Sequence, residues 1–158
     1  ADRLERGKPH LAQLMRSLES LIAFSNDLGL RLGFENRFHY YEIPVFEEMQ
    51  VILDTFHQPW VGWQLDVGHL QVYNALGLTS FRGWLDAFSP RIVGVHLHDV
   101  VGISDHRPPG TGEVDFDFLS NHLPEETYRT MEVDKRYSEN EIEKSLFFLK
   151  NAGCIEQI

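Results

Sequence analysis

Helical and strand-like segments alternate along this chain. The first segment, at about 9–28, has apolar residues every three or four positions, which is typical of one face of an amphipathic helix. Short apolar runs of strand length follow at 30–36, 60–69, 91–99 and 128–133, separated by further helical segments and followed by a last one at 139–150. This order predicts an α/β fold, a parallel sheet with helices outside it. A doubly wound sheet and part of a β/α barrel both satisfy the pattern.

Composition predicts one globular domain that spans residues 1–158. The 158 residues are 42% hydrophobic and 24% charged, enough for a buried core, and they contain no low-complexity segment or linker. The formal net charge of −10 repels polyanions and makes nucleic acid an unlikely partner. No apolar run approaches the roughly 20 residues that span a bilayer, so we expect no membrane partner. The single cysteine excludes a disulfide framework and a cysteine zinc site, and it fits a cytoplasmic location.

Each predicted strand ends in a carboxylate or an imidazole. The first ends in Glu35, the second in Asp66 with His69 a turn later, the third in His96 and His98, and the fourth in Glu132. Ligands bind at the carboxyl ends of parallel strands in α/β folds. The repetition favours one shared metal or catalytic site over four unrelated solvated loops.

Several of these residues also have an explanation that involves no shared site. Glu35 could pair with Arg37, and Asp66 could cap the helix that follows it. His106, in the loop before two prolines, could be an exposed residue without a role. Glu132 lies between apolar neighbours and would be costly to bury without a cationic partner.

The ligand set favours a hard or borderline divalent cation. Two glutamates, one aspartate and one histidine suit Mn²⁺, Mg²⁺ or Co²⁺, and further histidines favour Zn²⁺. Such an ion can hold a carbonyl and a neighbouring hydroxyl, while a carboxylate removes the proton between them. The chain has no glycine-rich phosphate loop, so nucleotide binding has no support.

Four short motifs resemble a known family. In order, they are "FEN", "LDVGH", "VHLHD…PGTGEVDF" and "MEV". Together they look like the second half of the xylose isomerase-like TIM barrels, over residues 10–151. That family includes sugar-phosphate isomerases and epimerases, ketose 3-epimerases and the endonuclease IV group.

The resemblance implies roles for the residues at the strand ends. It makes Glu35, Asp66, His96 and Glu132 the metal ligands of barrel strands five to eight, with His96 favoured over His98 because the family usually reads H-x-K-D or H-x-N-D. The two glutamates would also move a proton on either face of a cis-enediolate. The expected substrate contacts are His69, His98, His106 and Arg107. In endonuclease-like members, His69 would instead bind a second metal.

Two enzymatic functions follow from the resemblance. The first is a metal-dependent isomerase or epimerase of a small sugar or sugar phosphate. The alternative is an endonuclease IV-like phosphodiesterase that acts on abasic DNA. The acidic charge disfavours the alternative, and so does the adjacent pair Asp105-His106, where that group has D-x-H. A third, non-enzymatic reading is a barrel fragment with no competent site.

The family barrel has eight strands, and this chain supplies about four. Either an N-terminal half-barrel is missing from it or two copies associate. We expect the inner face of the sheet to carry Phe34, Leu65, Val95 and Met131 or their strand neighbours. Two free sheet edges and an uncovered face predict a homo-oligomer.

Overall fold

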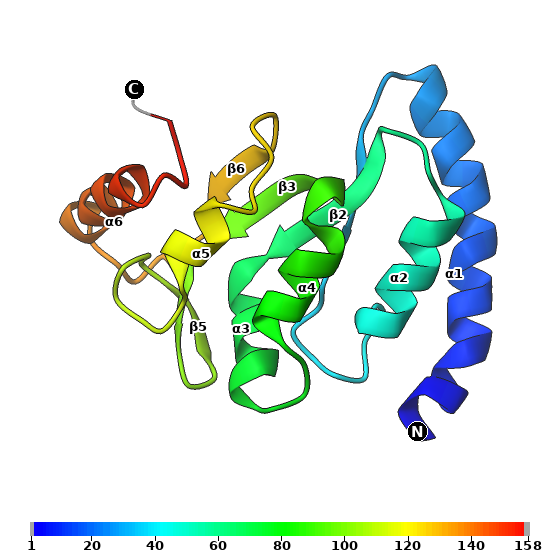
Figure 1. Cartoon of the computed structure of the whole chain (residues 1–158), viewed down its shortest axis with the longest axis horizontal. Helices are drawn as coiled ribbons and strands as arrows, with labels where there is room; N and C mark the ends of the chain where they lie inside the picture. The colour runs from blue at the N-terminus through cyan, green and yellow to red at the C-terminus, as the bar shows by residue number, and fades with distance from the viewer. Residues whose placement is uncertain (1, 157–158) are drawn as a thin grey trace.

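Four parallel strands form the main sheet of the computed structural model, which describes residues 2–156 (Figure 1). The strands are β1 (Leu32–Glu35), β2 (Val61–Asp66), β3 (Ile92–Leu97) and β6 (Tyr128–Met131), and they lie in the order β1-β2-β3-β6. Their sequential order is that of a barrel wall, whereas the strand order of a doubly wound sheet reverses. The predicted α/β fold is confirmed, and the barrel type is the one that the chain adopts.

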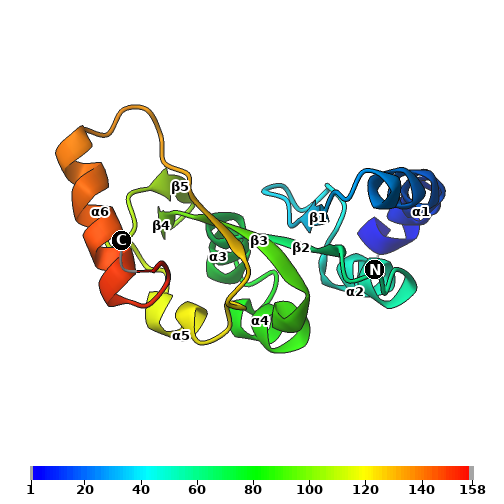
Figure 2. The ribbon, with the colours of Figure 1, turned by 90° about the horizontal axis from the view of Figure 1, so that it is seen from above.

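Helices connect the strands. They are α1 (Asp2–Asp27), α2 (Phe46–Thr55), α3 (Val67–Ala75), α4 (Phe81–Phe88), α5 (Phe116–Ser120) and α6 (Glu139–Asn151), with a 3₁₀ turn at Ser89–Arg91. Figure 2 shows α1 and α6 at opposite ends of the molecule, with the strands between them. No helix within residues 2–156 has the length and apolar character required to cross a membrane.

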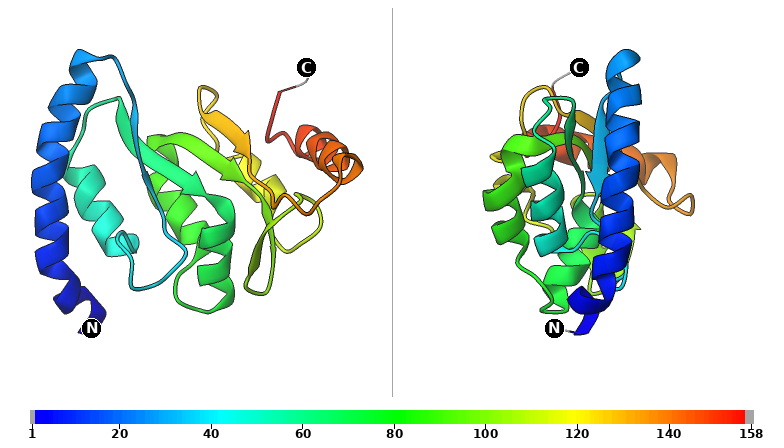
Figure 3. Two further views of the ribbon diagram at one scale, coloured as in Figure 1. Left: turned by 180° about the vertical axis from the view of Figure 1, so that it is seen from behind. Right: turned by 90° about the vertical axis from the view of Figure 1, so that its right-hand side faces the viewer.

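The segment after β3, which was expected to be a loop around His106, contains a hairpin. Residues Asp99–Val101 (β4) and Ser104–Arg107 (β5) pair as an antiparallel hairpin, and they form a second, two-stranded sheet. The tight turn between them contains Gly102, whose φ of 62° is accessible to glycine at little cost. The hairpin contacts α3, at the carboxyl ends of the main strands (Figure 3).

The core lies between the sheet and its outer helices. Trp63 and Leu65 of β2 and Val95 of β3 are fully buried, in one cluster with Trp84 and Leu85 of α4. A smaller cluster joins α1 to α2 and β2; its buried members are Leu18, Ile22, Ile52, Phe56 and Val61. Burying side chains of this size contributes roughly 1.5–3 kcal/mol each, so packing against the helices fixes the outer face of the sheet.

This packing decides which residues form the inner face. Leu65 and Val95 belong to the helix-packed core, so the inner face carries their strand neighbours instead. Gly62 and Gly94 lie there beneath other side chains: an added Cβ would come within 2.4 Å of Val93 Cγ1 and 2.1 Å of Gln64 Oε1, respectively. The inner face therefore carries glycines along β2 and β3, and the charged residues lie at the carboxyl ends of the strands.

Candidate active site

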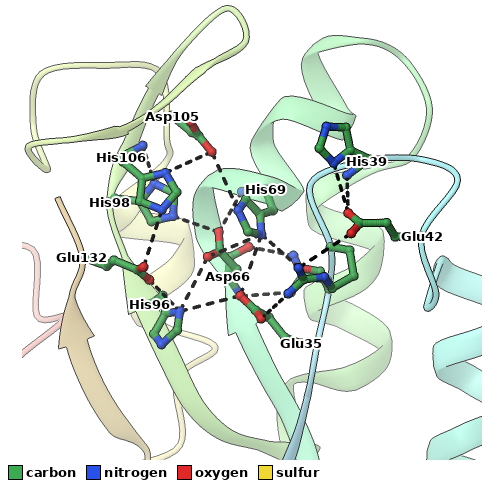
Figure 4. A network of polar contacts seen from close by, with 12 residues as sticks. Glu35, His39, Glu42, Asp66, His69, His96, His98, Asp105, His106 and Glu132 are labelled. Atoms are coloured by element: carbon green, nitrogen blue, oxygen red, sulfur yellow. Dashed lines mark hydrogen bonds and ion pairs between the residues drawn. The ribbon is translucent and has the colours of Figure 1, made fainter. Parts of the chain in front are cut away.

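Side chains from all four main strands converge at one end of the sheet. Glu35 ends β1, Asp66 ends β2, His96 lies in β3, and Glu132 directly follows β6. Asp66 and His96 are register partners, and the Glu132 N–H donates to the carbonyl of Leu97 at 3.1 Å. Figure 4 shows the four side chains pointing toward one another. Parallel pairing thus brings residues that are 30 or more positions apart into one cluster.

One ring nitrogen lies at the centre of this cluster. Nδ1 of His96 is 3.8 Å from Glu35 Oε1, 3.6 Å from Asp66 Oδ2 and 2.8 Å from Glu132 Oε2. A single imidazole N–H cannot satisfy three carboxylates, which would otherwise repel one another. A cation bound among these groups would offset the repulsion between the three carboxylates.

Two buried atoms of the cluster have no hydrogen-bond partner within residues 2–156. They are Oδ2 of Asp66 and Nδ1 of His96, since the contact of Nδ1 with Glu132 has the distance of an ion pair without the angles of a hydrogen bond. Buried polar atoms are rarely left unpaired, because each costs about 1–3 kcal/mol. Glu35, Asp66 and His96 can each offer a ligand atom within 4.8 Å of the others. The donors and the unpaired atoms fit a divalent metal ion.

The protonation of the cluster follows from its contacts. Burial alone would raise the pKa of Asp66, but interactions with the imidazoles of His96 and His98 outweigh it, and the pKa is lowered. The Asp66 carboxylate raises the pKa of His96 against partial burial, with help from the charges of Glu132 and Glu35. Asp66 is therefore held as the carboxylate, the form that binds a metal.

Asp66 also caps α3, as the sequence suggested. Its Oδ1 accepts the backbone N–H of His69 at 2.8 Å. The predicted contact of Glu35 with Arg37 is present too, at 2.7 Å from Oε2, and it leaves Oε1 facing His96. Both local roles are compatible with a shared site, because each uses only one carboxylate oxygen.

Two further predicted residues, His69 and His106, lie beside this cluster together with Asp105. Nδ1 of His69 is 3.5 Å from Asp66 Oδ2, and its Nε2 is 3.7 Å from Asp105 Oδ2. Nδ1 of His106 lies 3.1 Å from the same Asp105 oxygen, while its Nε2 lies 3.6 Å from Glu132 Oε1. His69, Asp105 and His106 form a second group, in which each residue offers a possible ligand atom within 4.8 Å of the others. Asp105 and His106 are neighbours in the sequence, yet both side chains face this group. His106 adopts a φ of 52° there.

His98 and Arg107 differ in how they contact the cluster. His98 is fully buried and contacts Asp66 and the backbone of His106, so it has no surface for a substrate. A substrate contact of His98 stays a prediction, which this burial does not support. Arg107 follows His106 in β5, half-buried, and among the described residues its Nε has no hydrogen-bond partner. No hydrogen bond or ion pair joins Arg107 to the cluster within residues 2–156.

Asn36 is a site residue that sequence reasoning missed. It is 1% exposed and clamps β1 to β2: its Oδ1 accepts from Trp63 Nε1 and from the backbone N–H of Asp66, both at 2.9 Å, and its Nδ2 donates to the Asp66 carbonyl at 2.8 Å. The only signal in the sequence is an amide residue directly after an apolar strand. Asn36 fixes the backbone from which the Asp66 carboxylate projects.

Asp99 has a structural role. It is 1% exposed, and its two oxygens accept four backbone N–H groups, from Val100 and Val114 at 2.9 and 3.1 Å and from Gly110 and Gly112 at 2.9 and 2.8 Å. By accepting these N–H groups, the Asp99 carboxylate stabilises the conformation of the Pro-Pro-Gly-Thr-Gly turn. The polar residues of the segment 95–116 therefore have two roles. Some belong to the candidate site, and Asp99 stabilises the loop structure.

Comparison with known proteins agrees with this architecture. The family model described as "Xylose isomerase-like TIM barrel" matches residues 3–152. Similar solved structures include IolI protein with a zinc atom (21% identity, TM-score 0.66, 86% of this chain and 53% of that chain) and a D-tagatose 3-epimerase-like protein (22% identity, TM-score 0.66, 90% and 54%). No curated protein matches the chain. The chain thus spans about half the length of these two structures. It belongs to the xylose isomerase-like TIM barrel family.

Proposed function

We propose that this chain carries the metal and catalytic residues of a divalent-metal-dependent isomerase or epimerase of a small sugar or sugar phosphate. The main support is the gathering of three carboxylates around one ring nitrogen of His96, with buried atoms left unpaired. Family membership supports the reaction class. The zinc atom in the IolI structure and the D-tagatose 3-epimerase-like neighbour are consistent with it.

The metal would be held by Glu35, Asp66, His96 and Glu132. When bound, a divalent ion (Mn²⁺, Mg²⁺, Co²⁺ or Zn²⁺) supplies the positive charge that polarises a substrate carbonyl and acidifies the neighbouring C–H. Asp66 contributes a carboxylate that its lowered pKa keeps ionised. Asn36 and the N-terminus of α3 hold that carboxylate in place.

Proton transfer is assigned to the two glutamates. Glu35 ends one outer strand of the sheet and Glu132 follows the other, so they approach the His96 position from opposite sides. One carboxylate takes the proton from the carbon next to the carbonyl, which gives a cis-enediolate of the substrate. The other carboxylate returns a proton on the opposite face, and the stereocentre is inverted. Their side chains are 27% and 43% exposed, accessible to a substrate.

Substrate contacts are proposed for the residues around the second group. His69, His106 and Arg107 come from α3 and β5, beside the metal ligands. The two imidazoles can bind hydroxyl groups of a sugar. The guanidinium of Arg107 can bind a hydroxyl or phosphate oxygen.

The second candidate function is an endonuclease IV-like phosphodiesterase. One observation favours it: His69, Asp105 and His106 form a group that could hold another metal ion. Multi-metal sites clamp both oxygens of a phosphoryl displacement. The net charge of −10 opposes binding to DNA, so we place this function second.

Elemental analysis of the purified protein, combined with two assays, separates these functions. One Mn or Co per chain together with epimerisation of a ketose or ketose phosphate supports the isomerase. Two or three Zn per chain together with cleavage of an abasic duplex supports the nuclease. Asp66→Asn should remove the isomerase metal, whereas the matched change Asp105→Asn should leave it. Protein that binds no divalent metal in either assay buffer contradicts both functions.

We also propose that further strands complete the barrel around this site. Among residues 2–156, β1 and β6 each have one neighbour in the sheet, so one edge of each offers unpaired backbone groups. The additional strands come either from a second copy of this chain or from another segment of a longer chain. In both cases they would supply the opposite wall of the substrate pocket.

A further inference from the structure

We infer that His98 is a positioning residue that couples the β4–β5 hairpin to the metal-facing carboxylate of Asp66. The inference rests on the proposed function, because it assigns His98 a role within that site. Its basis is one ring with two opposed contacts. Nε2 lies 2.8 Å from Asp66 Oδ1, and Nδ1 lies 2.8 Å from the backbone nitrogen of His106.

These contacts fix which nitrogen of His98 carries the proton. The backbone N–H of His106 can only donate, so Nδ1 of His98 must be the acceptor. The proton of the neutral ring is then on Nε2 and is donated to Asp66. The ring is fully buried, so bulk solvent does not compete for either nitrogen.

The bond to His98 determines which oxygen of Asp66 faces the proposed metal. Oδ1 accepts two hydrogen bonds, from His98 Nε2 and from the His69 backbone. Oδ2 accepts none within residues 2–156, and it lies 3.6 Å from His96 Nδ1. Partners of this kind, behind a ligand, orient it and tune its affinity for metal.

The opposite contact of His98 holds the hairpin. His106 has a φ of 52°, a left-handed conformation that is uncommon for residues other than glycine and requires support from its surroundings. The His98 ring gives that support twice, by accepting the His106 N–H and by stacking on its ring at 4.3 Å with an interplanar angle of 21°. This conformation brings His106 to 3.6 Å from Glu132 Oε1. One ring thus contacts a metal ligand on one side and the proposed substrate-contacting hairpin on the other.

The fold leaves a slot for this ring. A Cβ on Gly68 would lie 2.1 Å from Cε1 of His98 and 2.4 Å from its Nδ1. Only glycine at position 68 leaves room for an imidazole in contact with both Asp66 and His106. The position of α3 against the sheet therefore accommodates the His98 ring specifically. A residue that only filled space would not need this close approach of Gly68.

Two substitutions separate the two contacts. The side-chain amide of asparagine can place an oxygen near the position of Nδ1, so His98→Asn should keep the bond from His106 and lose the bond to Asp66. The longer His98→Gln should do the reverse, because its amide nitrogen reaches the position of Nε2. Two quantities are measured on each protein: the affinity for Mn²⁺ alone, by calorimetry, and the hydrogen exchange of the His106 amide.

We expect the effects to divide between the variants. His98→Asn should weaken Mn²⁺ binding about 10- to 100-fold with the exchange of His106 unchanged. His98→Gln should keep the affinity within about threefold, since the Asp66 bond is retained, while the His106 amide exchanges roughly tenfold faster, the effect of losing one hydrogen bond. Parallel changes in both quantities, or no change in either, would overturn the inference and leave His98 as a packing residue.

A measurement on the unchanged protein does not depend on the variants folding. The ring ¹⁵N shifts of His98 should show a neutral ring with its proton on Nε2. A proton on Nδ1 would contradict the inference. Failure of the unchanged protein to bind Mn²⁺, with the Nε2–H form present, would instead count against the proposed function alone.

Discussion

Glu35 ends the first strand of the four-stranded sheet and Glu132 directly follows the last, yet both reach the same atom. Oε1 of Glu35 lies 3.8 Å from Nδ1 of His96, and Oε2 of Glu132 lies 2.8 Å from it. The curvature of a parallel barrel wall explains this convergence, because it tilts the ends of the outer strands toward a common centre. Two carboxylates on opposite sides of one position are what a two-base epimerisation requires.

Replacing either glutamate should separate chemistry from metal binding. Glu35→Gln and Glu132→Gln should each reduce turnover at least about 100-fold, because an amide cannot accept the proton. Metal binding should weaken only partly, because the amide keeps an oxygen ligand. Deuterium exchange at the substrate carbon and Mn²⁺ titration on the same preparation test this. Undiminished exchange in either variant would rule out that glutamate as a base.

Asn36 should matter for stability more than its short side chain suggests. Asn36→Ala leaves the Trp63 indole N–H and the backbone of Asp66 without their partners, a cost of about 2–4 kcal/mol in the free energy of unfolding. Asn140→Ala, at an exposed position of α6, should change it by less than about 0.5 kcal/mol. Urea unfolding of both variants provides the comparison, and equal midpoints would contradict the role of Asn36.

Asp99 should behave as a structural anchor. Asp99→Asn places an NH₂ group against backbone N–H donors and should cost about 2–4 kcal/mol of unfolding free energy. Asp117→Asn, in an exposed position of α5, is the matched control. Metal content per folded molecule should stay the same in Asp99→Asn. Loss of the metal from folded Asp99→Asn would show that Asp99 supports the site directly.

Cys154 should make the fold sensitive to alkali. Burial, the largest influence, raises the pKa of its thiol to about 12, from an ordinary value of 9.0. The unfolded chain therefore ionises at lower pH than the folded one, so this contribution to stability is complete below pH 9 and is lost as the pH rises toward 12. Urea midpoints across this range should fall more steeply for the unchanged protein than for Cys154→Ala. Superimposable curves would argue against it.

The molecular mass in solution tests whether two copies of the chain associate. If two copies complete the barrel, light scattering on a size-exclusion column should give about twice the chain mass of 18.3 kDa at micromolar concentration. Exposed apolar side chains at both ends of the molecule favour association; they include Phe24 of α1, Leu28 directly after it, and Phe147 of α6. A monomer of 18.3 kDa with a cooperative thermal transition would contradict the dimer.

Local patterns in the sequence determined the order of the elements and the residues at the strand ends. Apolar periodicity marks α1 and the four main strands, because helices and strands bury side chains at different spacings. Parallel pairing then requires the ends of neighbouring strands to meet, so the gathering of Glu35, Asp66, His96 and Glu132 could be predicted without coordinates. The helix-capping role of Asp66 was also readable, since it depends on residues only three positions apart.

Only the tertiary structure decided which face of each strand is inside and which polar residues support the site. Alternation alone leaves two choices of face, and packing against α4 selected the one that buries Leu65 and Val95. The contacts of Asn36 and His98 with Asp66 join positions 30 and 32 residues apart. Sequence patterns report spacing along one element, whereas these hydrogen bonds depend on the distance and direction between elements. The convergence of the strand-end residues was therefore predictable, and the residues that hold them in place were not.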